Sequence, residues 1–460
     1  MNSSVSIPGA PAAPAGSAPP LWQQLQAAAQ VLAAVRGGQS APVALLEVDA
    51  SLRPGVRALV YRVLRWLGQA EALRRKLAPR TPPPLPDALL CTALALVWRE
   101  SDAPYEPFTL VDQAVEAAKR SPAMRPQSGF VNACLRRFLR ERDALVEATA
   151  QEPLAHWNHP RWWIERLKRD HPRQWQDILR ANNLQAPMVL RVNERKTTRA
   201  QVLQALIAIN VIAEEVGEHG VLLGRALPVE DIPGFADGHV SVQDAAAQLA
   251  APLLLDGMDR SRPLRVLDAC AAPGGKTAHL LEHAGADAAI DVTALDIDPA
   301  RCERIHQNLD RLGLSARVVV ADAQEPSAWW GSAVERRPFD AILLDAPCTA
   351  SGIVRRQPDV RWLRRESDIG QLAIVQAALL AKLWPLVVPG GRLLYCTCSV
   401  FRDEGDRQIE AFLAHHTDAV LLPSPGHLLP RHGADAGGVR ENLPRDHDGF
   451  FYALLHKRPG

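Results

Sequence analysis

Short apolar segments alternate with helical segments from residue 264 to about residue 400, and this alternation leaves few architectures open. A strict alternation of strands and helices predicts a doubly wound α/β sheet. A sheet of this kind binds its ligand beyond the carboxyl ends of the strands, where the strand order reverses. The predicted strands are Leu264–Ala269, Val292–Leu295, Val318–Ala321, Ala341–Leu344 and Leu393–Thr397.

The segment before this sheet has a different pattern. Over residues 21–148, apolar side chains recur at helical spacing without strand alternation, which predicts an all-α domain. Residues 149–236 combine a helix candidate (162–169) with an extended run (188–193), so we expect a small α+β connecting domain there. Residues 237–460 form the α/β domain, and the Ala/Pro-rich residues 1–20 predict a disordered tail. The fold class is therefore multidomain.

Composition narrows the class of protein further. The 460 residues carry a formal net charge of +1, so any contact with nucleic acid must come from local basic patches. The seven cysteines include no CxxC pair, which favours reduced thiols over a disulfide framework or a zinc site, and no metal is expected. No basic and apolar leader precedes Arg36, and the most apolar stretch, 372–388, is broken by Gln376, Lys382 and Pro385. We expect a cytoplasmic monomer without a membrane span.

The first predicted strand leads into a tight glycine turn and a helix start, from Val266 to Thr277. A phosphate loop would need glycine where Cys270 stands, and no GxGxxG is present, so neither a triphosphate nor a pyrophosphate site is favoured. Acids follow the next three strands at Asp296, Asp322 and Asp345. Carboxylates in such positions bind ribose hydroxyls, and this pattern predicts an adenosine-type ligand without phosphate, with S-adenosylmethionine as the candidate.

Two cysteines come directly after the fourth and fifth predicted strands, Cys348 in Asp-Ala-Pro-Cys and Cys398 in Thr-Cys-Ser. Carbon 5 of cytosine is a poor nucleophile, but addition of a thiolate to carbon 6 makes it enamine-like and able to attack a sulfonium methyl group. A second group must then help to remove the carbon 5 proton and release the enzyme. Two thiols could divide these steps.

These motifs together resemble the RNA (cytosine-5)-methyltransferase family. The resemblance implies that Cys398 is the nucleophile, that Cys348 assists release, and that S-adenosylmethionine is the cofactor. Asp296, Asp322 and Asp345 would complete the cofactor site, and Asp345 could also face the cytosine. The implied cofactor loop consists of Cys270, Ala271, Ala272, Pro273, Gly274, Gly275 and Lys276. Segments 233–235, 241–245 and 448–452 are also similar to the family's pattern.

The helical domain has a resemblance of its own. Segments 57–60 and 129–137 are similar to the RNA-binding fold of the antitermination factor NusB. A NusB-like domain joined to this catalytic domain implies an rRNA methyltransferase that acts on cytosine 967 of bacterial 16S rRNA, either as free RNA or as a small-subunit assembly intermediate. Three alternatives stay open: a tRNA cytosine-5 methyltransferase, a DNA enzyme with Cys348 as nucleophile, and a non-catalytic RNA-binding adaptor. The NusB-like domain and Cys398 argue against DNA.

Basic side chains predict two RNA-contacting patches, because neutralised phosphates supply most sequence-independent affinity. The N-terminal patch contains Arg53, Arg57, Arg62, Arg65, Arg74, Arg75, Lys76 and Arg80, against one acid, Glu71. The second follows Cys348 and contains Arg355, Arg356, Arg361, Arg364 and Arg365, with Trp362 as a candidate for base stacking or for the core. Cys396 departs from the family pattern, and we interpret it as a packed neighbour of Cys398 over a competing nucleophile.

Overall fold

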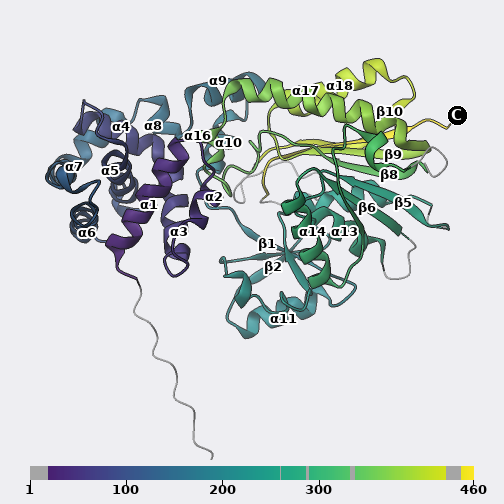
Figure 1. Ribbon diagram of the computed structural model, residues 1–460, viewed down its shortest axis with the longest axis horizontal. Coiled ribbons are helices and arrows are strands. Elements are labelled where there is room, and N and C mark those ends of the chain that lie inside the picture. Colours follow the sequence, from purple (N-terminus) through teal and green to yellow (C-terminus); the bar gives the residue numbers. More distant parts are fainter. Residues whose placement is uncertain (1–18, 260, 286–289, 332–336, 431–446, 460) are drawn as a thin grey trace, which may run out of the picture. The chain divides into compact units, whose positions relative to one another are not determined.

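The computed structural model describes residues 19–259, 261–285, 290–331, 337–430 and 447–459. The chain divides into two compact units, residues 1–155 and 156–460 (Figure 1). Most of the predicted tail, residues 1–18, lies outside the described residues.

The first unit is helical, as predicted. Its most buried helix is α5, which contacts α1, α3, α4, α6 and α7. Proline occupies the first turn of α2, α3, α5 and α6, where its fixed φ suits a helix start and its missing N–H costs no hydrogen bond. The helices are α1 Leu21–Arg36, α2 Ala41–Leu46, α3 Arg53–Arg65, α4 Leu67–Leu77, α5 Pro84–Val97, α6 Pro107–Arg120 and α7 Ser128–Thr149, with α8 Pro153–Trp157 at the boundary.

The second unit begins with a small antiparallel sheet of order β2-β3-β1-β4. Its strands are β1 Met188–Val192, β2 Ala213–Val216, β3 Gly220–Leu223 and β4 Val240–Val242, with α9 Arg161–Asp170, α10 Trp175–Asn182 and α11 Arg199–Ala208. Leu190, Val221 and Val240 from the sheet pack with Val202 and Leu206 from α11 in one apolar core. The mixed helix and strand character predicted for the connecting segment is thus observed.

The seven-stranded sheet has the order β10-β11-β9-β8-β5-β6-β7. Strands β5 to β9 run parallel, and β11 pairs antiparallel with both β9 and β10. The order grows outward from β5 through β6 to β7 and then returns to the other side of β5 with β8, so the switch point lies between β5 and β8. The strands are β5 Leu264–Ala269, β6 Ile290–Asp296, β7 Arg317–Val320, β8 Phe339–Asp345, β9 Val387–Thr397, β10 Ala419–Leu428 and β11 Phe450–Lys457.

Helices cover both faces of this sheet, which is why its central strands are apolar on both sides (Figure 1). One face packs against α12 Ala250–Leu255, α13 Gly275–Ala284 and α14 Pro299–Leu312, and the other against α15 Pro326–Trp329, α17 Glu366–Leu383 and α18 Asp406–His415; the short α16 Val360–Leu363 precedes α17. Segment Glu366–Leu386 is long and apolar enough to span a membrane. Core helices that cover a sheet meet the same criterion of length and composition.

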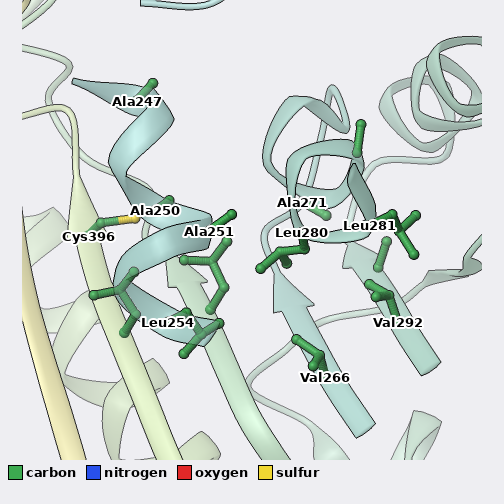
Figure 2. Close-up of a cluster of buried hydrophobic side chains, with 14 of the residues drawn as sticks. Ala247, Ala250, Ala251, Leu254, Val266, Ala271, Leu280, Leu281, Val292 and Cys396 are labelled. Carbon is green, nitrogen blue, oxygen red and sulfur yellow. The ribbon is translucent and has the colours of Figure 1, made fainter. Parts of the chain in front are cut away.

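Cys396 belongs to the core beneath α12. Figure 2 shows its side chain pointing from β9 toward Ala250, among the buried side chains that join the sheet to α12 and α13. The side chain is fully buried, and burial is the main cause that raises the pKa of its thiol well above the ordinary value. A neutral thiol inside an apolar cluster packs as a small hydrophobic group, which favours the interpretation of Cys396 as a packed neighbour.

Candidate active site

The predicted cofactor loop connects β5 to α13 at the switch point of the sheet. Cys270 and Gly274 both have positive φ (61° and 94°), and a Cβ at Gly274 would lie 3.1 Å from Ile305 Cα, so only glycine fits this turn without strain. Two side chains from α14 hold the loop from outside: Asn308 donates to Pro273 O at 2.7 Å, and Arg301 donates to Ala272 O at 3.1 Å.

Asp296 ends β6 and supports the same loop. Its Oδ2 accepts a hydrogen bond from Ala272 N at 3.1 Å, and Oδ1 accepts one from Asp298 N at 3.2 Å. The carboxylate is almost fully buried but lines the cavity described below. Part of its hydrogen-bonding capacity therefore shapes the loop before any ligand arrives.

A cavity of about 360 Å³ opens beyond the carboxyl ends of β5, β6, β7 and β8. Seven of the predicted site residues line it: Cys270, Ala272, Asp296, Asp322, Asp345, Cys348 and Cys398. Asp322 follows the end of β7 by two residues. The other predicted loop residues do not line it and form the turn and the start of α13: Ala271, Pro273, Gly274, Gly275 and Lys276. The volume lies in the usual range for small-molecule sites.

The cavity suits an adenosine-type ligand by its chemistry. Asp296 and Asp322 offer carboxylate acceptors for hydroxyl groups, while Ile297, Val375 and Leu379 provide apolar surface for a ring. A sulfonium cation would find the Asp345 carboxylate on the same wall. The residues present therefore fit S-adenosylmethionine.

Lys276 is not a lining residue of the cavity, but its ammonium group binds Asp345, which is one. The Nζ–Oδ2 distance is 2.6 Å, and Asp345 Oδ1 accepts from Cys396 Sγ at 3.5 Å. Burial disfavours the charge on Lys276, but the neighbouring Asp345 carboxylate outweighs it and the pKa of Lys276 rises well above its ordinary value. The ion pair fixes Asp345, the last residue of β8, beside the thiols that follow.

The two thiols meet at the edge of this cavity. Cys348 Sγ and Cys398 Sγ are 3.4 Å apart, within hydrogen-bond distance for sulfur. The hydrogen bond to Cys398, followed by burial, raises the pKa of Cys348 well above the ordinary thiol value. Cys348 is consequently held as the neutral thiol beside Cys398.

Glu404 is a buried residue that sequence reasoning missed. It accepts hydrogen bonds from Thr349 N (2.8 Å), Gln376 Nε2 (3.2 Å) and the hydroxyls of Thr349 and Ser399. Thr349 and Ser399 directly follow Cys348 and Cys398, so one carboxylate joins the two segments that carry the thiols. Glu404 ends the short 3-10 helix η6 (Arg402–Glu404), outside every motif, and so gave no signal in the sequence.

The predicted RNA patch after Cys348 is wrong for its first three arginines. Arg355 is fully buried against Asp448, and Arg356 binds Asp244 and Asp448. Arg361 is fully buried and donates to the carbonyl oxygens of Asn158 and Asn182. Arg364 donates to the carbonyls of Thr349 and Cys348. These four guanidiniums are bound by groups of the protein itself, and Arg365 is the exposed member of the five.

The N-terminal patch is also smaller than predicted, because acids distant in sequence neutralise part of it. Arg62 pairs with Asp102 at 2.9 Å, Arg74 with Asp87 at 3.0 Å, and Arg75 with Glu152 at 2.6 Å. Arg53 donates to the carbonyls of residues 45, 46 and 48. Arg57 and Arg80 are exposed, and they stay candidates for RNA contact.

Asp268, in β5, gives the site a pH-dependent stability. Burial is the main cause that raises its pKa to about 7, although Thr277 Oγ1 donates to Oδ2 at 2.6 Å. Between about pH 4 and pH 7 the unfolded chain therefore loses a proton that the folded chain keeps, and stability falls as pH rises, by up to about 4 kcal/mol.

We expect Asp268→Asn to remove this slope. The urea midpoint of the variant relative to the wild type should rise progressively from pH 4 to pH 7 and then level off. Asp310→Asn, at an exposed position on α14, is the control. Parallel curves for the wild type and Asp268→Asn would contradict a raised pKa at Asp268.

Comparison with known proteins places this geometry in a family. Residues 254–456 match the family described as 16S rRNA methyltransferase RsmB/F, residues 159–230 match its ferredoxin-like domain, and residues 24–140 match the NusB family. Ribosomal RNA small subunit methyltransferase B of Vibrio cholerae is 37% identical over 92% of this chain and 94% of its own length. The protein of the same name from Serratia proteamaculans is 43% identical over 72% of this chain and 74% of its own length.

Solved structures of other proteins share the fold described above. PH0851 superposes with a TM-score of 0.72 at 26% identity, over 99% of this chain and 100% of that chain. A methyltransferase homologue from Pyrococcus horikoshii gives a TM-score of 0.53 at 27% identity, over 66% of this chain and 97% of that chain.

A NusB domain, a ferredoxin-like connecting domain and a Rossmann-like sheet with this cavity define an S-adenosylmethionine-dependent rRNA methyltransferase. Its RNA substrate is 16S rRNA, for which the NusB domain is a fitting binding module. The chain belongs to the RsmB/F family of 16S rRNA methyltransferases.

Proposed function

We propose that the protein methylates carbon 5 of a cytosine in 16S rRNA through a covalent bond between Cys398 and carbon 6 of the base. The observation that carries the proposal is the 3.4 Å separation of the Cys348 and Cys398 sulfurs at the edge of the cofactor cavity. Methylation of carbon 5 requires a nucleophile at carbon 6 and a second group for release. The paired thiols fit both requirements.

The residues of this chain divide the work. S-adenosylmethionine supplies an electrophilic methyl group when bound. Cys398, as the thiolate, adds to carbon 6, and its electron pair makes carbon 5 nucleophilic. Cys348, whose pKa is raised first by the hydrogen bond to Cys398 and then by burial, stays a thiol while Cys398 attacks. After methyl transfer Cys348 gives its proton to solvent, and its thiolate accepts the proton from carbon 5. The electron pair of that carbon–hydrogen bond forms the 5,6 double bond and expels Cys398 as the thiolate.

The remaining predicted residues position the reactants. Asp296, Asp322 and the loop from Cys270 to Lys276 bind the cofactor, and the Lys276–Asp345 ion pair fixes a carboxylate on the wall shared with both thiols. Since carbon 6 is covered by stacking in a helix, the cytosine must be unstacked, at a cost of a few kcal/mol.

The proposed target is cytosine 967, in free 16S rRNA or in a small-subunit assembly intermediate, as implied by the family resemblance. The test is a methylation assay with 16S rRNA tritiated at carbon 5 of cytosine, in which transfer to carbon 5 releases tritium into water. We expect one tritium released per methyl group incorporated and none from RNA with uracil at position 967.

Each failure has a distinct meaning. Methyl incorporation without tritium release would exclude carbon 5 as the acceptor. Release that persists in the uracil variant would move the target to another cytosine, and release from tRNA alone would favour the tRNA alternative.

A further inference from the structure

Three histidines outside the cofactor cavity converge on a common point. His219 lies in the turn between β2 and β3, and His279 and His283 lie four residues apart on one face of α13. One ring nitrogen from each lies within 4.8 Å of the others. They line a cavity of about 480 Å³ together with Glu194, Glu218 and Glu282.

His279 is a buried residue whose ring nitrogens lack hydrogen-bond partners among the described residues, which indicates a role in binding a ligand. Its side chain is 1% exposed. Buried polar groups in native proteins are normally satisfied. A ligand bound at this ring would supply the partner that the described residues do not provide.

The other two rings are oriented by carboxylates. His283 Nε2 is 2.7 Å from Asp256 Oδ1, and His219 Nδ1 is 3.2 Å from Glu194 Oε1. Each ring thereby keeps its second nitrogen for the centre of the cluster, where His283 Nδ1 and His219 Nε2 face each other at 3.3 Å. For His219 and His283, this carboxylate partner is the arrangement that fixes the tautomer of metal-binding imidazoles.

We propose that His219, His279 and His283 bind a zinc ion. Two ligands about 2.05 Å from a tetrahedral zinc ion lie roughly 3.3 Å apart, which is the separation already present between His219 and His283. Imidazole nitrogens suit zinc, and three of them leave a fourth position for water or for Glu218, whose Oε1 is 3.8 Å from His219 Nε2. Glu282 is not available, because both its oxygens bind Arg191.

The ion would join two parts of the second unit. His219 belongs to the connecting sheet, while α13, which carries the other two histidines, starts at the cofactor loop. Bound zinc would therefore fasten the connecting sheet to the helix that follows the cofactor loop. The proposed site does not depend on the reaction assigned to the thiols.

Zinc binding is tested on the full chain, purified with a tag that lacks histidine and stripped of metal. We expect one zinc ion per chain by calorimetry and a rise in the unfolding temperature with zinc concentration. Asp256→Asn, which keeps all three ligands but loses one carboxylate partner, should weaken affinity about 10–100-fold. His219→Ala and His283→Ala should weaken it at least as much, and the exposed His306→Ala should leave it unchanged.

Cobalt substitution identifies the donor atoms. Three imidazoles give weak visible d–d bands, whereas thiolates would add intense near-ultraviolet charge-transfer bands. The proposal is overturned if the wild type shows no saturable zinc binding, if binding survives unchanged in both His219→Ala and His283→Ala, or if the cobalt spectrum shows thiolate ligation. Because Asp256→Asn retains every ligand, it keeps the test valid where a histidine variant fails to fold.

Discussion

Cys398→Ala should abolish the covalent protein–RNA adduct and lower the rate of methyl transfer by at least about a thousandfold. Loss of a catalytic nucleophile typically lowers the rate by more than this factor. Cys348→Ala should behave differently. The nucleophile remains, so the adduct still forms, but the group that assists release is gone and the adduct accumulates while turnover falls about 10²–10⁴-fold. The 3.4 Å contact between the sulfurs is the structural reason for this pairing of roles.

The measurement is a denaturing gel of protein incubated with 16S rRNA and labelled S-adenosylmethionine. Cys396→Ala is the matched control for a competing nucleophile. It removes a buried core thiol two residues from Cys398 (Figure 2), whose Sγ donates to Asp345 Oδ1 at 3.5 Å, while Asp345 keeps its ion pair with Lys276. This control should keep near-normal methyl transfer and lose roughly 1–2 kcal/mol of stability. An adduct that accumulates in Cys398→Ala and is absent from Cys348→Ala would reverse the roles, and loss of the adduct in Cys396→Ala would make that thiol the nucleophile.

Glu404→Ala should destabilise the catalytic domain by more than about 3 kcal/mol. It leaves the donors on Thr349, Gln376 and Ser399 buried without an acceptor, and each such group costs about 1–3 kcal/mol. Glu404→Gln keeps one acceptor oxygen and should cost less. Burial already raises the pKa of Glu404, so the neutral amide also avoids the cost of a buried charge.

The informative comparison is made on Glu404→Gln at a temperature where it stays folded. If Glu404 positions the thiols, adduct formation should slow at least about tenfold at saturating RNA while the circular dichroism spectrum stays native. The exposed Glu410→Ala on the neighbouring α18 is the control. Adduct formation at the wild-type rate in folded Glu404→Gln would limit Glu404 to a structural role.

Local patterns in the sequence were sufficient to predict the parallel strands and the functional residues at their ends. Apolar runs identified β5 to β9, and the acids and cysteines that follow them converge on one cavity because parallel strands deliver their carboxyl ends to one edge. The helical character of the first unit was equally visible from its 3.6-residue period.

Ion pairs between residues distant in the chain could not be predicted from the sequence. Arg356 binds Asp448, 92 residues away, and Arg62 binds Asp102, so charge runs that look exposed in the sequence are partly neutralised in the fold. For the same reason the sequence did not predict the role of Glu404, which has no motif around it. It did not predict the histidine cluster either, because its members come from a turn and a helix 60 residues apart in the chain. Spacing arguments detect metal sites only when the ligands are close in sequence.

Arg191 ties the two parts of the second unit together by a buried charge. This strand β1 residue binds both oxygens of Glu282 (2.7 and 2.9 Å) and the carbonyl of Gly275, at the first residue of α13. A fragment that begins after the connecting domain would leave Glu282 without its countercharge, so we expect the isolated sheet domain to be less stable than the whole second unit. In synthesis from the N-terminus, Arg191 leaves the ribosome 91 residues before Glu282, so its guanidinium lacks its carboxylate partner until that residue emerges.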